Sequence, residues 1–470
     1  MRWIAIIMSV LLLSGCAGAS KNQPETPEPR ALTASDIQLL AGELVPRDQN
    51  GWEESREPLK TVMWNRGLSA HLRLLALDAL LTHDEDDTVS MLWYLLPSET
   101  DWVVLEAIAL EAQVRDWTRL APSFVRSLRR EVVEPSFTDR PEHRALVALH
   151  PDKTIEEIIY GVFADTSLTS DLGTRARQDA WTLLLRLDPQ RERVLDLLAS
   201  SGSTDDPLMG DLQAAASDLH AIATTPEQMR WLEQMRQPEH ASFWSSASTA
   251  IGALRDGQRE DLTLAHVGLV THASAVAPEI MSETRQSLLS MLHARFDGRS
   301  VVERGTGDTF DHPELLETWE DDLSWGDLLS LVMIDDILND PALLETFFAQ
   351  AQEDRFDNTT EHGGIIDPDG QTTRLRRFIP RPSQRRGDTT YIAPPEMMVA
   401  STRALAMYHF HANGVQNRDR AGPSSADLRF ARESGRVCVV LTLIRRERLD
   451  VDVYFPSGAI VDLGVFESPR

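Results

Sequence analysis

Cysteine is scarce in this chain of 470 residues, which contains only Cys16 and Cys438. Two cysteines cannot form a cysteine-rich zinc module, and folding must depend on packing rather than on a framework of disulfides. Cys438 lies in the apolar run Val437–Leu443. We therefore predict that Cys438 is a small buried core residue.

Basic residues are also few, because 46 Lys and Arg stand against 73 Asp and Glu, which gives a formal net charge of −27. The excess acid lies upstream of residue 351, since residues 351–470 contain 17 Arg, no Lys and 16 acidic residues. A strongly acidic body repels backbone phosphates, so we expect no nucleic-acid binding. The contents of 42% hydrophobic and 25% charged residues are typical of a folded protein.

The sequence has no hydrophobic run long enough to span a bilayer comfortably. The short apolar run Trp3–Leu13 leads into a Leu-Ser-Gly-Cys motif that ends at Cys16. This arrangement resembles the signal sequence of bacterial lipoproteins. The resemblance implies a signal peptide at residues 1–15, acylation of Cys16 and a flexible, proline-containing tether at residues 16–32.

A lipid anchor at Cys16 would place the protein in the cell envelope, on the outer membrane facing the periplasm if the cell has two membranes. It would also leave the other cysteine without a disulfide partner. An ordinary signal peptide or a short membrane anchor is the alternative interpretation.

Residues 33–298 have a loosely repeating helical pattern in which apolar residues recur at three-and-four spacing. Pairs of helices separated by short turns are similar to an α-solenoid of the HEAT type. Such a region could offer a protein partner a concave surface, or it could be a plain helical domain that packs against its neighbour. The clearest helical runs are residues 68–81, 88–96, 102–130 and 174–199.

A break rich in Gly, Asp, Thr, Pro and Glu at residues 298–322 marks a domain boundary. Two helices are expected next, and beyond Phe356 the apolar period changes from 3.6 to 2, which predicts an α/β domain over residues 325–470. The expected helices are 326–338, 341–351, 395–403 and 425–434. The expected strands are 364–367, 375–380, 389–392, 405–411, 437–444, 449–455 and 459–463.

Polar residues of the kind used in hydrolytic sites are concentrated in this domain. Side chains two apart on a strand point to one face, so His409 and His411 would be neighbours. Ser424 occupies the N-cap position of the next helix, and Asp427 lies on its first turn. Glu361 stands upstream, two residues before a Gly-Gly pair.

This order of elements resembles the JAMM (Mov34/MPN-type) metalloprotease family over about a quarter of the chain. The resemblance implies that His409, His411 and Asp427 bind zinc. It also implies that Glu361 deprotonates the attacking water and that Ser424 helps to stabilise the oxyanion. Three protein ligands and an open fourth position are what a hydrolytic zinc site requires.

Each part of this pattern also has a simpler interpretation. Ser424 and Asp427 form an ordinary capping box, the histidine pair could lie on a surface strand, and Glu361 could be a turn residue. An arginine cluster that includes Arg374, Arg376 and Arg377 could dock an acidic substrate segment or pack on the protein's own acidic region.

Two functions are therefore expected from the sequence. The first is a membrane-anchored, zinc-dependent peptidase or isopeptidase that acts on a peptide or protein substrate. The second is a non-catalytic lipoprotein scaffold with a structural or vestigial metal site.

Overall fold

The computed structural model describes residues 49–202, 205–302, 314–414 and 416–469. The chain divides into two compact units, the first ending at Val194 and the second beginning at Leu195. The predicted signal peptide, the tether and Cys16 lie outside the described residues. Over the described ranges, every helix is too short or too polar to cross a membrane.

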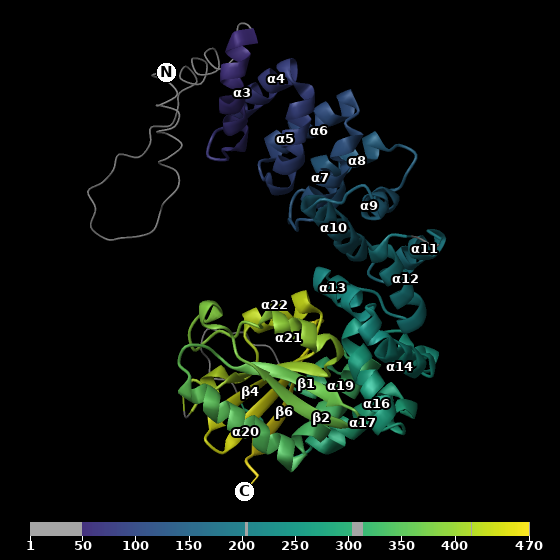
Figure 1. The fold of residues 1–470 in the computed structure, drawn as a ribbon, viewed down its shortest axis with the longest axis vertical. Helices are drawn as coiled ribbons and strands as arrows, with labels where there is room; N and C mark the ends of the chain where they lie inside the picture. Colours follow the sequence, from purple (N-terminus) through teal and green to yellow (C-terminus); the bar gives the residue numbers. More distant parts are fainter. Residues whose placement is uncertain (1–48, 203–204, 303–313, 415, 470) are drawn as a thin grey trace, which may run out of the picture. The chain divides into compact units, whose positions relative to one another are not determined.

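The first unit consists of helices joined by short turns (Figure 1). A buried ion pair between Arg73 and Glu99 lies in its core, where Arg73 also donates to the carbonyl oxygen of Met63 at 3.0 Å. The α-helices are α3 (Gln49–Trp64), α4 (Ala70–His83), α5 (Glu85–Leu95), α6 (Trp102–Arg115), α7 (Ala121–Leu128), α8 (Pro141–Leu149), α9 (Ile155–Ala164) and α10 (Asp171–Leu187). The predicted helical pattern is confirmed here, whereas the HEAT-like arrangement stays a prediction.

The second unit combines further helices with a six-stranded sheet. The division between the units falls within α11 (Glu192–Ser200). The helices before the sheet are α12 (Pro207–Leu219), α13 (Pro226–Met235), α14 (Ala241–Gly252), α15 (Asp256–Arg259), α16 (Val267–Val276), α17 (Arg285–Phe296), α18 (Leu316–Trp319), α19 (Trp325–Leu338) and α20 (Pro341–Phe356).

The sheet is mixed and has the strand order β2-β1-β3-β4-β5-β6. Strands β3 and β4 are parallel, and the other neighbours are antiparallel. The strands are β1 (Gly363–Asp369), β2 (Thr372–Phe378), β3 (Ala406–His411), β4 (Cys438–Arg445), β5 (Arg448–Tyr454) and β6 (Ile460–Glu467). Helix α21 (Pro395–Ala400) precedes β3, and α22 (Ser425–Ser434) connects β3 to β4.

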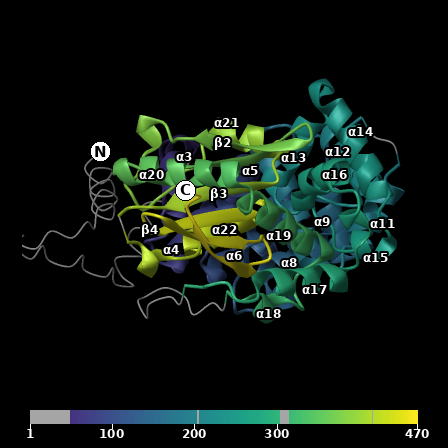
Figure 2. The same ribbon diagram turned by 90° about the horizontal axis from the view of Figure 1, so that it is seen from below.

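Helices cover both faces of this sheet (Figures 1 and 2). On one face, Phe347 of α20 packs edge-on against Tyr408 and Phe410 of β3. On the other face, Met397 of α21 and Ala431 of α22 share a buried cluster with strand residues. Both faces of the sheet are therefore buried in its middle. This agrees with β3, in which every residue is buried.

Helices that precede the sheet in sequence pack directly on its connecting segments. The Trp231 indole of α13 donates to the carbonyl oxygen of Thr402 at 2.6 Å, and the Gln228 amide donates to that of Gly435 at 3.1 Å. Gly268 of α16 lies so close to Arg403 and Ala404 that a Cβ atom would clash with their carbonyl oxygens. These helices consequently form one compact unit with the sheet, although the sequence pattern changes only near residue 356.

Most predicted elements of the C-terminal region are confirmed, and their ends differ from the predicted ends by at most five residues. They include α21, α22 and strands β3 to β6. The prediction of a strand at residues 389–392 is wrong, because that segment is a loop outside the strands of the sheet. Its β-forming residues lead into Pro394 and Pro395, which lack the amide hydrogens that a ladder needs. Cys438 is 1% exposed, which confirms the prediction that it is a core residue.

We expect Gly364→Ala to destabilise the second unit. A Cβ atom there would clash with the carbonyl oxygen of Arg376 and would lie 2.7 Å from the hydroxyl of Tyr408. Overpacking of this kind lowers the free energy of unfolding by about 1–3 kcal/mol. Urea unfolding of the full chain would measure this loss. The control is Gly252→Ala in α14, where no atom lies within 4 Å of the added carbon. Equal unfolding midpoints for both variants would contradict the expectation.

Candidate metal centre

The two histidines of β3 face each other on the side of the sheet that α21 and α22 cover. The distance between His409 Nε2 and His411 Nε2 is 3.3 Å, and their side chains are largely buried. His411 Nδ1 lies 2.8 Å from the carbonyl oxygen of Arg420, which can only accept a hydrogen bond. This contact fixes the proton on Nδ1 and leaves Nε2 of His411 available as a metal ligand.

Asp427 reaches both histidines from the first turn of α22. Its Oδ1 atom lies 3.4 Å from His409 Nε2, and its Oδ2 atom lies 3.8 Å from His411 Nε2. Ser424 caps the helix: its amide donates to Asp427 Oδ2 at 2.7 Å, and its hydroxyl accepts from the Asp427 amide at 3.3 Å. The cap thus holds the carboxylate at the histidine pair.

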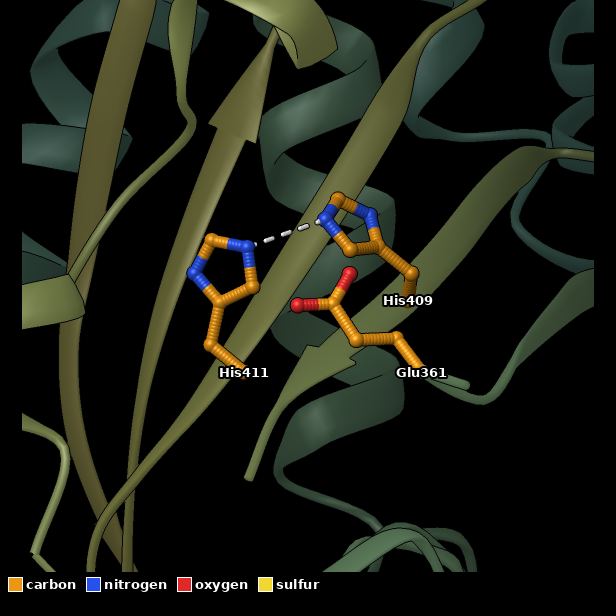
Figure 3. A group of neighbouring side chains, drawn as sticks. All are labelled: Glu361, His409 and His411. Carbon is orange, nitrogen blue, oxygen red and sulfur yellow. Dashed lines mark hydrogen bonds between the residues drawn. The ribbon is translucent and has the colours of Figure 1, made fainter. Parts of the chain in front are cut away.

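Glu361 arrives at the same point through β1. Gly363 is the register partner of His409, so the residues immediately before β1 lie beside the end of β3. Figure 3 shows the carboxylate of Glu361 next to the two imidazole rings. Glu361, His409 and His411 each offer one ligand atom, and these atoms lie within 4.8 Å of one another. The structure thus contains a buried cluster that could hold a metal ion.

The spacing of the donor atoms fits a tetrahedral ion. Nitrogen ligands at 2.0–2.1 Å from a tetrahedral zinc are separated by about 3.3 Å. His409 Nε2 lies 3.3 Å from His411 Nε2 and 3.4 Å from Asp427 Oδ1, whereas the contact of Asp427 with His411 Nε2 is made by Oδ2, at 3.8 Å. Two imidazole nitrogens and the Asp427 carboxylate could supply three of the four ligands of such an ion. A fourth corner is then left for a water molecule or a substrate oxygen.

Burial and mutual charge shift the pKa values of these groups in opposite directions. Burial raises the pKa of the Glu361 carboxyl to about 7. Burial and the neighbouring His409 lower the pKa of His411 to about 4. Burial disfavours protonation of His409, but the Asp427 carboxylate outweighs it and raises the His409 pKa above its ordinary value. Strongly shifted groups in one pocket are typical of functional sites.

These residues line a pocket of about 260 Å³. Its lining combines the polar cluster with apolar side chains. Tyr391 stacks parallel to His409, with ring centroids 6.1 Å apart. The apolar lining residues include Tyr391, Ala393, Met397, Met407 and Phe430. The loop that was wrongly predicted as a strand therefore forms part of the pocket.

Asp354 supports the Glu361 loop and was not identified from the sequence. It is fully buried near the end of α20, and its Oδ1 accepts from the amide of His362 at 2.5 Å. Burial raises the pKa of this carboxyl to about 8. His362, whose role the sequence did not assign, contacts Asp357 at 3.1 Å. The contact of Asp354 with the His362 amide has no signal in the sequence, where Asp354 is simply an acidic residue in a helical pattern.

The arginines proposed for docking already have carboxylate partners in their own domain. Arg374 and Arg376 both bind Asp367, at 3.0 and 3.2 Å, and Arg377 pairs with Glu353. An acidic substrate segment would have to compete with these contacts, so docking at this cluster stays a prediction.

We expect the full chain to bind one zinc ion at this cluster. His409→Ala and Asp427→Asn should lose the ion because each removes a ligand, whereas Glu361→Gln should retain it. His71→Ala, which changes an exposed histidine of α4, is the matched control. Elemental analysis and competition with a zinc chelator measure the outcome. Loss of zinc in Glu361→Gln with retention in Asp427→Asn would instead make Glu361 the third ligand.

We expect the metal-free protein to become less stable as pH rises from about 6.5 to 8. Glu361, Asp354 and His409 have raised pKa values and bind their protons more tightly in the folded state. The stability that these three groups contribute to the folded state is therefore present at low pH. It is lost as pH rises through their raised pKa values. Asp354→Asn should flatten the decline in urea unfolding measured with a chelator. A stability that increases over this window would contradict the expectation.

Comparison of the chain with protein families, with characterised proteins and with solved structures gives no match.

Proposed function

We propose that this chain is a zinc-dependent peptidase or isopeptidase of the JAMM type. The observation that carries the proposal is the approach of two imidazole nitrogens and the Asp427 carboxylate to within 3.3–3.8 Å of one another, in a pocket that Glu361 also lines. The donor set of two imidazoles and a carboxylate suits zinc and leaves a position open, which is the pattern of hydrolytic rather than structural sites.

A bound zinc ion would lower the pKa of a water molecule to about 7 and would polarise the carbonyl of the substrate. Glu361 is suited to accept the proton of the attacking water, because burial raises the pKa of its carboxyl to about 7. A base with a pKa close to the working pH both takes up a proton and releases it readily. Glu361 would then pass the proton to the leaving amine.

Two further groups would position the reaction. The backbone contact from His362 to Asp354 holds the loop that carries Glu361. Ser424 lines the pocket beside Asp427, where its hydroxyl could stabilise the developing oxyanion. The apolar lining residues Met397, Met407 and Phe430 would accommodate an apolar group of a peptide or protein substrate.

The setting of this activity is also part of the proposal. The lipoprotein-like N-terminus would anchor the protein through Cys16 in the cell envelope, and the helical region would bind the substrate or a protein partner. Zinc would be the only cofactor required, and no nucleic acid would take part.

A scaffold with a structural metal is the second candidate. It is favoured by the burial of His409 and His411, which are 4% and 9% exposed, because structural metal sites are closed to solvent. Glu361 favours the peptidase, because a structural ion bound by the other three residues needs no base.

We expect Glu361→Gln to abolish peptide cleavage without loss of zinc. Removal of a general base typically lowers the rate by about 10²–10⁴-fold. The assay is cleavage of a peptide library by the zinc-loaded full chain. Glu345→Gln, on an exposed position of α20, should cleave as the wild type does. Full cleavage by Glu361→Gln would exclude the proposed mechanism, and zinc-loaded wild type without cleavage would favour the scaffold.

A further inference from the structure

A second group of acidic side chains lies on β5 and β6. Asp450, Asp452 and Asp462 each offer a carboxylate oxygen, and these atoms lie within 4.8 Å of one another. Unlike the acidic groups common on protein surfaces, all three residues are buried, with exposed fractions of 1%, 0% and 7%. Carboxylates so close together in a region of low dielectric constant repel one another when they are ionised.

The register of the sheet brings these side chains together. Asp450 and Asp452 are two residues apart on β5 and share a face. Asp462 is the register partner of Asp452 on β6. A bulge follows at Gly464, whose φ of 94° suits glycine and whose amide donates to Asp462 Oδ1 at 2.6 Å. The bulge therefore orients the third carboxylate toward the other two.

The hydroxyl of Thr442 provides an independent indication of a ligand. Thr442 on β4 is the register partner of Asp450, so its side chain lies on the face that carries the carboxylates. It is fully buried, and its Oγ1 atom has no hydrogen-bond partner among the described residues. A buried hydroxyl without a partner destabilises the folded state. A ligand at the acidic group would offset this cost.

We propose that Asp450, Asp452, Asp462 and Thr442 form a site for a hard divalent cation, with calcium as the best fit. Every donor is an oxygen atom, which suits calcium or magnesium and not zinc. Oxygen ligands at 2.3–2.6 Å from one calcium ion can be separated by no more than about 5 Å, as the three carboxylates are. The cation would tie β4, β5 and β6 together.

This site is separate from the histidine cluster and does not depend on the proposed peptidase activity. Both lie on the same face of the sheet, where Val440 of β4 stands between His409 and Asp452 in the register and Thr442 stands between His411 and Asp450. The two donor sets differ in kind, since one includes imidazole nitrogens and the other consists of oxygens. Each site can therefore be removed without changing the ligands of the other.

The test uses the full chain with His409→Ala, so that the histidine cluster does not respond, after treatment with a chelator. Thermal unfolding and titration calorimetry are measured with calcium, magnesium and zinc chloride. We expect calcium to raise the melting temperature and to bind once per chain. Asp452→Asn should lose both effects, whereas Asp321→Asn, at an exposed position, should keep them.

Thr442→Val provides a second variant that conserves volume. We expect it to melt at a higher temperature than its parent in the chelator, because the buried hydroxyl is removed, and to lose part of the shift caused by calcium. A parent protein whose melting temperature does not respond to any of the cations would overturn the proposal. A calcium response that survives Asp452→Asn would overturn it as well.

Discussion

The pairing of β3 between β1 and β4 is the interaction on which the candidate metal centre depends. Because a strand has a side-chain period of two, this pairing sends Tyr408 and Phe410 into the core under α20 and places His409 and His411 on the other face. A slip by one residue would bury the imidazoles against Phe347 and expose the aromatic rings to the pocket. Apolar packing on one face thus fixes the polar site on the other.

Burial gives these polar groups their unusual properties. Glu361 and His409 are each 4% exposed, and the carboxyl of Asp354 is fully buried. In this setting the raised pKa of Glu361 and the lowered pKa of His411 show that charge is poorly accommodated without a counter-ion. A divalent cation would reverse this balance by stabilising the ionised carboxylates and the neutral imidazole. The cluster could therefore hold a metal ion.

The elements that carry the site could be predicted because local pattern and tertiary fold agree. Apolar runs with period two specify β3 to β6, and the Ser424 cap specifies the start of α22. Asp354 could not be predicted, since its contact with the His362 amide exists only after α20 packs on the sheet. The acidic group on β5 was missed for a related reason. Alternating Asp and apolar residues normally indicate a face exposed to solvent, whereas here that face is buried.

The capping box of α22 shows how a simple structural role and a functional one can share the same residues. The cap uses the amide of Ser424 and one oxygen of Asp427, Oδ2. The other oxygen, Oδ1, is 3.4 Å from His409. Oδ1 therefore stays available to a metal ion, and the cap fixes the side-chain rotamer that points the carboxylate at the histidine pair. The positive end of the helix dipole further favours the ionised carboxylate at this position, and the neighbouring His409 lowers its pKa. A helix start that would be ordinary elsewhere becomes part of a preorganised site once β3 places two imidazoles in front of it.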